Sequence, residues 1–192
     1  MAEQLGFAFE QNRCMGCKAC QVACKDKNDL EVGDNWRKVV ETEGGKYIPS
    51  GNALQNDVYA FWTSMSCNHC VDPLCVKNCP TGALYKRETD GLVLVDESKC
   101  IGCRYCTWSC PYDAPVYNSK TGIIGKCDFC KDRLQQGLEP ACVGACPVHA
   151  LHFGNLADLQ KEFGRVSQAK GVADPKYTKP ALVIVPHRHA MI

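Results

Sequence analysis

Hydrophobic and polar residues along the chain predict short strands and one short helix rather than long regular elements. Strand-forming residues are concentrated at residues 36–40, 58–64 and 91–95, with a turn signal at Gly44-Gly45 between the first two runs. Residues 156–163 have the spacing of an amphipathic helix, with Asn155 as its N-terminal cap. No hydrophobic run approaches the roughly 20 residues that a membrane-spanning helix needs.

The hydrophobic run at residues 180–186 begins and ends with proline and predicts a single strand. Proline cannot donate a ladder hydrogen bond, so a strand bounded by prolines is typical of a sheet edge. Two interpretations remain open for this segment. It is either an edge strand on the protein's own surface or a tail that pairs with a partner subunit.

The chain has 192 residues and 16 cysteines, and the cysteines fall into four motifs of four with none left over. The third motif has the spacing C-x2-C-x2-C-x3-C-P, and the first repeats it with lysine in place of proline. The second and fourth motifs are looser versions of the same pattern. In chain order, the motifs are Cys14, Cys17, Cys20 and Cys24; Cys67, Cys70, Cys75 and Cys79; Cys100, Cys103, Cys106 and Cys110; and Cys127, Cys130, Cys142 and Cys146.

The chain also repeats itself around these cysteines. The string RCMGCKAC at residues 13–20 aligns with KCIGCRYC at 99–106, and CPTGAL at 79–84 aligns with CPVHAL at 146–151. Internal similarity of this kind indicates two related structural units within the chain.

The spacing of the motifs is that of bacterial ferredoxins, in which the fourth cysteine ligates a neighbouring cluster. Cysteines three apart in a tight loop bring three thiolates together. The fourth, followed by proline in three of the motifs, is predicted to start a helical turn that points away. Gly16 and Gly102 lie between cysteines, where the backbone must curl tightly. Sixteen thiolates at four per cluster predict four [4Fe–4S] clusters.

Other uses of these residues are less consistent with the pattern. Disulfides require an oxidising compartment, and the N-terminal residues 1–4 begin neither the basic nor the hydrophobic region of a secretory signal. The fourth motif alone could bind zinc, whereas the first and third do not suit a zinc ribbon. His69 lies within the second motif, and a hydrogen-bonding or surface role is expected for it because the cysteines already satisfy four clusters. Residues 187–189 are expected to be a solvated tail.

The charged residues and the absent motifs narrow the function further. The net charge of +1 gives no reason to expect nucleic-acid binding. Lys18, Arg104 and Lys126 lie beside cysteines, where a positive charge favours the reduced, more negative cluster and raises its potential. No nucleotide-binding, phosphate-binding or nucleophile motif is present, so neither catalysis nor a direct small-molecule substrate is expected. The chain is predicted to be a non-catalytic electron-transfer protein.

The order of the motifs predicts an α+β fold in which two bacterial-ferredoxin-like modules are nested as a pseudo-repeat. The second and third motifs form an inner two-cluster module at residues 67–110, and the first and fourth form an outer module from residues 1–27 and 111–155. Residues 28–66 contain no cysteine and are predicted to be a β-rich insertion, and residues 156–192 a C-terminal docking tail. Helical turns after the fourth cysteines and small hairpins should supply most of the regular structure.

The order of the motifs and the strings CNHC, CIGCRYC and CDFC resemble those of a known family over nearly the whole chain. The family comprises the four-cluster iron–sulfur subunits of membrane-associated molybdopterin oxidoreductases, and the similarity is to the dimethyl sulfoxide reductase type. It implies that each cluster takes ligands from two motifs. The implied sets are set 1, Cys14, Cys17, Cys20 and Cys146; set 2, Cys24, Cys127, Cys130 and Cys142; set 3, Cys67, Cys70, Cys75 and Cys110; and set 4, Cys79, Cys100, Cys103 and Cys106.

The same resemblance implies that electrons pass singly between two partners. Set 1 would face a molybdopterin catalytic subunit, and set 4 a membrane subunit that oxidises quinol. Nitrate-reductase-type relatives carry tryptophan at the position of Cys103 and build a 3Fe–4S cluster there, so Cys103 favours four [4Fe–4S] clusters. The nearby Trp108 is expected to serve in packing.

The location and the alternative function follow from the same family. The complex would lie peripheral to the cytoplasmic membrane, on the periplasmic side by export with a signal-bearing partner, with a cytoplasmic location as the alternative. The alternative function is a freestanding polyferredoxin that serves hydrogenase or formate systems. The insertion at residues 28–66 and the tail after Gly154 exceed what cluster binding requires, which favours docking onto large partners.

Overall fold

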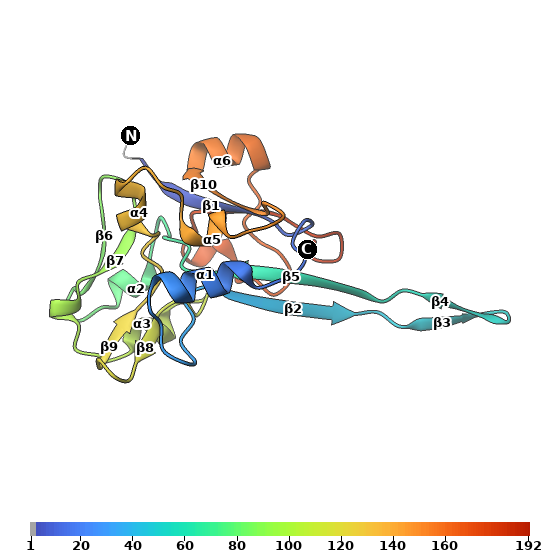
Figure 1. Cartoon of the computed structure of the whole chain (residues 1–192), viewed down its shortest axis with the longest axis horizontal. Coiled ribbons are helices and arrows are strands. Elements are labelled where there is room, and N and C mark those ends of the chain that lie inside the picture. Colours follow the sequence, from blue (N-terminus) through green and yellow to red (C-terminus); the bar gives the residue numbers. More distant parts are fainter. Residues whose placement is uncertain (1–2) are drawn as a thin grey trace.

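The computed structural model describes residues 3–192, which form small sheets and short helices around a core rich in cysteine (Figure 1). This mixture agrees with the predicted α+β class. Within the described residues, no helix combines the length and the hydrophobicity needed to cross a membrane.

A three-stranded sheet brings the two ends of the chain together. Its central strand β1 (Leu5–Glu10) runs antiparallel to β10 (Leu151–Asn155) and parallel to β11 (Leu182–Val185). Side chains of a strand alternate between the two faces of a sheet. Phe7 and Phe9 accordingly belong to the core that contains the cysteines, whereas Ala8 belongs to the smaller cluster beneath helix α6.

Helix α6 (Leu156–Phe163) covers that sheet, as the hydrophobic spacing predicts. Asn155 caps it, because its side-chain oxygen accepts a hydrogen bond from the backbone N–H of Ala157 at 2.9 Å. Leu159 is buried against Ala8 and Val183. The predicted helix and its cap are confirmed.

The proline-bounded segment near the C-terminus pairs within its own chain. β11 lies at the edge of the sheet beside β1, with Val183 and Ile184 buried. The structure therefore shows an edge strand of the protein's own sheet, as the first of the two interpretations predicts. The chain then turns back over β5, where the ring of His189 stacks on Tyr59 with centroids 4.2 Å apart. The expectation of a solvated tail at residues 187–189 is wrong, because these rings pack on aromatic side chains.

A long two-stranded arm projects from the body (Figure 1). Strands β2 (Lys38–Gly44) and β5 (Tyr59–Met65) form its base, and β3 (Tyr47–Ser50) and β4 (Ala53–Asn56) form its tip. β5 matches the predicted strand at 58–64, whereas β2 begins two residues later than the predicted 36–40 and continues further.

The turn predicted at Gly44-Gly45 is wrong. The Asp57 N–H donates to the Lys46 carbonyl at 3.1 Å, so the two strands stay paired beyond Gly45. The chain reverses instead between Ser50 and Ala53, which are register partners at the end of the arm.

Two smaller hairpins support the middle of the chain. β6 (Leu84–Lys86) pairs with β7 (Val93–Val95), and β8 (Val116–Asn118) pairs with β9 (Ile123–Gly125). β7 lies within the predicted strand at 91–95. Apart from the helices that carry cysteines, the remaining elements are helix α4 (Lys131–Gln135) and two 3₁₀ turns at Glu97–Lys99 and Pro175–Tyr177.

Each cysteine motif contributes one short helix, and each of these helices carries the third cysteine of its motif. The helices are α1 (Ala19–Lys27), α2 (Leu74–Lys77), α3 (Tyr105–Ser109) and α5 (Ala141–Gly144). The prediction that the helical turn follows the fourth cysteine is wrong. Proline disfavours the helical conformation in the residue before it, so the helix ends before the fourth cysteine when proline comes next. Lys25 follows Cys24, and α1 therefore continues through it.

Candidate iron–sulfur centres

The loops of the first and third motifs have nearly the same backbone. Gly16 and Gly102 both have positive φ, at 72° and 66°. Lys18 (φ 60°, ψ 8°) and Arg104 (φ 63°, ψ 7°) are both left-handed and immediately precede α1 and α3. Two left-handed residues per loop curl the chain so that its first three cysteines lie on one side.

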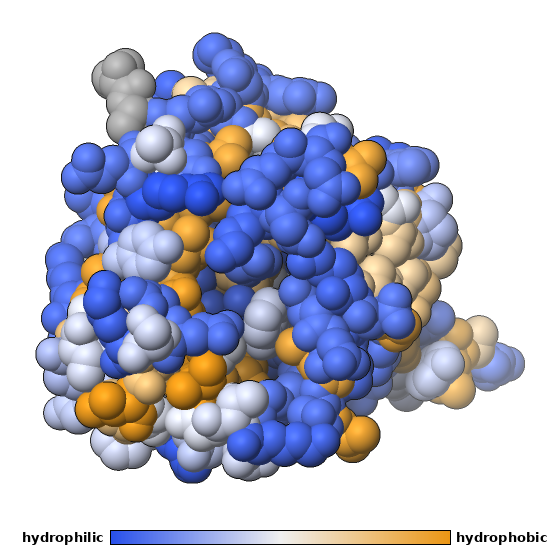
Figure 2. Space-filling view, turned by 60° about the vertical axis from the view of Figure 1, so that its left-hand side comes forward, coloured by the Kyte–Doolittle hydropathy of each residue, from blue (hydrophilic) through white to orange (hydrophobic). Residues whose placement is uncertain are grey.

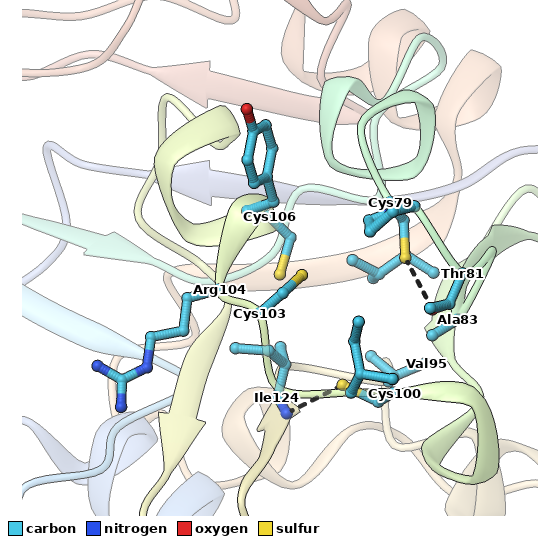
Figure 3. Close-up of a pocket in the computed structure, with 13 residues that line it drawn as sticks. Cys79, Thr81, Ala83, Val95, Cys100, Cys103, Arg104, Cys106 and Ile124 are labelled. Carbon is cyan, nitrogen blue, oxygen red and sulfur yellow. Dashed lines mark hydrogen bonds between the residues drawn. The ribbon is translucent and has the colours of Figure 1, made fainter.

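The four cysteines of set 4 surround one cavity. Cys79 from the second motif lines it together with Cys100, Cys103 and Cys106 from the third. Their sulfur atoms face a common space, whereas the Arg104 side chain points away from it (Figure 3). The structure thus brings together cysteines that two different motifs supply.

Backbone and hydroxyl groups of neighbouring loops surround the sulfur atoms of set 4. The Ile124 N–H donates to Cys100 Sγ at 3.5 Å. Burial raises the pKa of the Cys79 thiol, but hydrogen bonds from the Leu84 backbone and from Thr81 outweigh it, so that pKa is lowered overall. These donors favour the thiolate, the form that binds metal.

Set 1 surrounds a second cavity. Cys14, Cys17 and Cys20 line it together with Cys146 from the fourth motif. Cys20 Sγ lies 3.4 Å from the Ser64 hydroxyl of β5, and the Ala150 N–H donates to Cys146 Sγ at 3.3 Å.

The cysteines of set 2 lie together in the interior. Burial, opposed by Arg37 and assisted by the nearby thiolates of Cys142 and Cys130, raises the pKa of Cys24 to about 12. Burial also raises the pKa of Cys127 well above its usual value, and Cys24 and Cys142 add to that effect. Cys24 reaches this set because α1 packs against α5, the helix that carries Cys142.

The cysteines of set 3 form the other interior group. Burial raises the pKa of both Cys70 and Cys75 to about 12, and in each case the thiolates of Cys67 and Cys110 contribute. Cys110 is the member from the third motif, and the extended conformation at its position carries it out of α3.

Neighbouring sets are also close to one another. The charge of Cys142 in set 2 raises the pKa of Cys20 in set 1. The charge of Cys67 in set 3 likewise raises the pKa of Cys127 in set 2. α2 of the second motif packs against α3 of the third, next to set 4. The sets therefore form a series from 1 to 4.

The two ends of that series reach the surface and its middle does not. Cys17 of set 1 and Cys103 of set 4 are exposed, whereas the cysteines of set 2 are all buried and those of set 3 are buried except for the half-buried Cys110. An electron carrier that exchanges electrons at its two ends requires this distribution.

The side chains around the cysteines fit a group rich in hydrogen-bond acceptors. Three buried side-chain nitrogens have no hydrogen-bond partner in residues 3–192, and each is a nitrogen that can donate: Arg37 Nε, Asn68 Nδ2 and His69 Nε2. Buried donors without partners are costly. Asn68 and His69 lie between Cys67 and Cys70, and the sulfides of an iron–sulfur cluster would serve as acceptors. In the described part of the chain, no three His, Cys, Asp or Glu side chains are placed to bind a single metal ion.

His69 has the hydrogen-bonding role expected of it. It is fully buried, and its Nδ1 accepts a hydrogen bond from the Val93 N–H at 3.0 Å. The neutral ring then carries its proton on Nε2. Burial, followed by the charge of Lys126, keeps the pKa of His69 well below its usual value, so this neutral form is retained.

The three cationic residues that neighbour cysteines in the sequence differ in their exposure to solvent. Lys18 and Arg104 are exposed, whereas Lys126 is buried and donates to the Cys127 carbonyl at 3.0 Å and to the Val93 carbonyl. Of these three residues, only Lys126 has a charge whose effect on a nearby cluster is not strongly screened by water and salt. Arg37, which is also buried, carries no comparable sequence signal because it is not adjacent to any cysteine in the chain.

The expectation that Trp108 serves in packing is wrong. Its side chain is 81% exposed and near only Tyr105 among the aromatic rings of residues 3–192. Tyr105, also in α3, and Ile101, in the loop before it, are exposed as well. Figure 2, turned toward this side of the molecule, shows hydrophobic side chains interrupting the hydrophilic surface in its lower part. The surface beside set 4 is therefore partly apolar.

Comparisons with known proteins agree with this arrangement. Residues 58–156 match the model of a family described as a 4Fe–4S dicluster domain. The chain is 45% identical to the B subunit of anaerobic dimethyl sulfoxide reductase of Escherichia coli, over 99% of this chain and 92% of that protein. It is 40% identical to the B subunit of polysulfide reductase of Wolinella succinogenes, over 100% and 99%. Identity to the thiosulfate reductase electron transfer subunit of Salmonella typhi is also 40%, over 93% and 94%.

Proposed function

We propose that this chain, which belongs to the 4Fe–4S dicluster domain family and to the iron–sulfur subunits of dimethyl sulfoxide reductase-type complexes, transfers electrons and does not itself catalyse a reaction. The single observation that carries this proposal is the series of four cysteine sets whose two ends reach the surface. Relatives that are named as subunits of dimethyl sulfoxide, polysulfide and thiosulfate reductases disfavour the freestanding polyferredoxin.

In this proposal, sets 1 to 4 each hold one [4Fe–4S] cluster, and all sixteen cysteines are ligands. A bound cluster supplies a one-electron redox centre. The chain provides the thiolates, excludes water from sets 2 and 3, and keeps one side of sets 1 and 4 near the surface. The location of the cysteines therefore defines both the path and its two ends.

We further propose that the two ends bind different partners. Set 1 would face a molybdopterin catalytic subunit and set 4 a membrane subunit that oxidises quinol. The partly apolar surface formed by Ile101, Tyr105 and Trp108 supports docking at set 4. At the other end, Trp62 of β5 lies against the set 1 loop at Gly16, so the arm extends from the side of set 1.

The division of the chain into nested modules is part of the same proposal. The outer module would comprise residues 1–27 and 111–155, the inner module residues 67–110, and the arm the insertion at residues 28–66. Residues 156–192 would complete the outer module and help dock it. The matched backbone at Gly82 and His149, both with positive φ after a Cys-Pro pair, supports the pseudo-repeat.

A peripheral location at the cytoplasmic membrane follows from the proposed partners. The membrane subunit would hold the complex there, on the periplasmic side if a partner carries an export signal and on the cytoplasmic side otherwise.

The test uses the chain isolated under anaerobic conditions from cells that express it with its natural partners. Four [4Fe–4S] clusters predict about sixteen iron atoms per chain and a matching amount of sulfide. Affinity capture of the chain should also recover molybdenum and the oxidised fluorescent products of molybdopterin.

Two results would contradict the proposal in different ways. Bound zinc with iron near zero would exclude the clusters. A full iron content in a monomer that recovers no molybdenum would leave the clusters in place and favour the polyferredoxin alternative.

A further inference from the structure

Arg37 is a positive charge enclosed within the protein. Arg37 directly precedes β2 in the chain, and the residue is only 2% exposed. Nη1 donates to Ser64 Oγ at 3.1 Å, and Nη2 donates to Ser66 Oγ at 2.9 Å. Nε has no hydrogen-bond partner in residues 3–192. Both acceptors are neutral, so these hydrogen bonds do not balance the charge.

No carboxylate of residues 3–192 forms an ion pair with Arg37. A buried charge without a counter-ion is strongly destabilising. Burial opposes the charged form, but nearby thiolates outweigh it and raise the pKa of Arg37 above its usual value. In decreasing order of effect, they belong to Cys142, Cys20, Cys127 and Cys24. Three of these cysteines belong to set 2 and one to set 1.

Ser64 links Arg37 to set 1. Its hydroxyl oxygen accepts from Arg37 and lies 3.4 Å from Cys20 Sγ. When Cys20 is a thiolate it can only accept, so the Ser64 hydroxyl donates to it. Ser64 therefore connects Arg37 to set 1 by hydrogen bonds.

We propose that Arg37 is a fixed charge that raises the reduction potentials of the clusters at sets 1 and 2. This inference rests on the proposed function, because it requires clusters at both sets. Reduction adds one negative charge to a cluster, and a nearby cation favours that form. In a medium of dielectric about 20, a unit charge about 10 Å away changes the reduction equilibrium constant by roughly tenfold.

The test compares the midpoint potentials of all four clusters in anaerobic holoprotein, measured by redox titration with EPR detection. In Arg37→Gln, one midpoint should fall by about 59 mV or more, which is a tenfold change for a one-electron couple. A second midpoint should also fall. The other two should move by less than about 30 mV, which corresponds to a threefold change in the reduction equilibrium constant, because the thiolates with the largest effect on Arg37 belong to sets 1 and 2.

Two control variants separate charge from other effects. Arg37→Lys keeps the charge and changes the hydrogen bonds, so its midpoints should remain near those of the wild type. Lys18→Gln removes an exposed cation beside Cys17. Because water and salt screen that charge, all four midpoints should move by less than about 30 mV, which corresponds to a threefold change in the reduction equilibrium constant.

A second route avoids removing the arginine. Ser66→Asp places a carboxylate beside Nη2 and cancels the charge in place, with Ser66→Asn as the uncharged control. The aspartate variant should lower the midpoints at sets 1 and 2 even if Arg37→Gln fails to assemble. Because residue 66 directly precedes Cys67 of set 3, the midpoint at set 3 is left out of this comparison.

The inference is overturned if either charge-removing variant holds about sixteen iron atoms and all four midpoints are unchanged. It is also overturned if Arg37→Lys shifts as far as Arg37→Gln, because the charge would then not be the cause. Iron near zero in the wild-type protein would instead refute the proposed function, so the two failures are distinguishable.

Discussion

The loops at residues 13–20 and 99–106 follow the same backbone path but are covered by different parts of the chain. A Cβ atom at Gly16 would overlap the indole ring of Trp62, a side chain of the arm. A Cβ atom at Gly102 would instead overlap the backbone carbonyl of Gly122, next to the hairpin β8–β9. The local sequence therefore determines the loop, and distant segments determine what lies against it. One motif can in this way serve at two ends of a molecule that contact different partners.

The two loops differ again in how the fourth cysteine leaves them. Cys24 stays within α1, one turn beyond Cys20, whereas Cys110 is extended and lies outside α3. The residue that follows is lysine in the first case and proline in the second. A single position thus decides whether the chain reaches the next cysteine set along a helix or along an extended segment.

The largest effect is expected from making the first motif resemble the third. Lys25→Pro removes a backbone hydrogen bond within α1 and clashes with the preceding turn, at a cost of about 3 kcal/mol or more. We expect Cys24 to lose its position in set 2, so that about four of the sixteen iron atoms are missing. Iron and sulfide analysis with a denaturant titration, both anaerobic, provides the measurement.

Lys25→Ala is the matched control for that variant. It removes the Lys25 Nζ hydrogen bonds to the carbonyls of Glu31 and Asp34 but keeps the helix. Pro111→Ala is the reverse change in the third motif. Both should retain all four clusters. Full iron content in Lys25→Pro would show that the helical path of α1 is not required for set 2.

An intermediate effect is expected from alanine at the two glycines. Gly16→Ala and Gly102→Ala each place a side chain at positive φ, which costs of order 1–3 kcal/mol, and each adds a steric overlap. The overlap at Gly16 involves a side chain, so adding Trp62→Ala should recover part of the stability lost in Gly16→Ala. No side-chain substitution removes the overlap at Gly102, because it involves a backbone oxygen.

Anaerobic denaturant titrations of the single and double variants test this difference. Equal recovery of both glycine variants by Trp62→Ala would contradict it. So would a Gly102→Ala protein that is as stable as the wild type.

The features that the sequence predicts correctly depend on neighbouring residues. The cap at Asn155 needs only the residues that follow it, and the two left-handed loops repeat one string. The prediction that each set combines cysteines of two motifs depends on the resemblance to a family. The cavity around set 4 is lined by the cysteines that this resemblance assigns to it.

The features that the sequence does not predict depend on distant segments. Arg37 lies in a run typical of a half-exposed strand, and its burial follows from serines 27 and 29 residues away. Gly44-Gly45 is a typical turn signal, but pairing between Lys46 and Asp57 carries the strands past it. Trp108 would ordinarily be assigned to a core, and only the placement of α3 at the surface leaves it exposed.

The smallest change in iron content is expected from replacing the exposed cysteine of each loop. Cys103→Trp should leave the fold intact, because Cys103 is exposed, and convert the cluster at set 4 to a 3Fe–4S form. This is the replacement that nitrate-reductase-type relatives carry. The loss is about one iron atom of sixteen, with a new EPR signal in the oxidised protein and a higher midpoint potential. Cys17→Trp is the equivalent change in set 1, where Cys17 is also exposed.

The two tryptophan variants should differ in one respect. At set 1 the new side chain would compete for space with Trp62, whose indole ring would overlap a Cβ atom at Gly16. At set 4 the nearest side chain to a Cβ atom at Gly102 is that of Tyr117, at 3.3 Å. We therefore expect Cys17→Trp to lose more than one iron atom and Cys103→Trp to lose only one. An unchanged EPR spectrum in Cys103→Trp would contradict the assignment of Cys103 to set 4. Equal iron loss in both variants would contradict the inference that Trp62 of the arm makes the set 1 loop less tolerant of a large side chain than the set 4 loop.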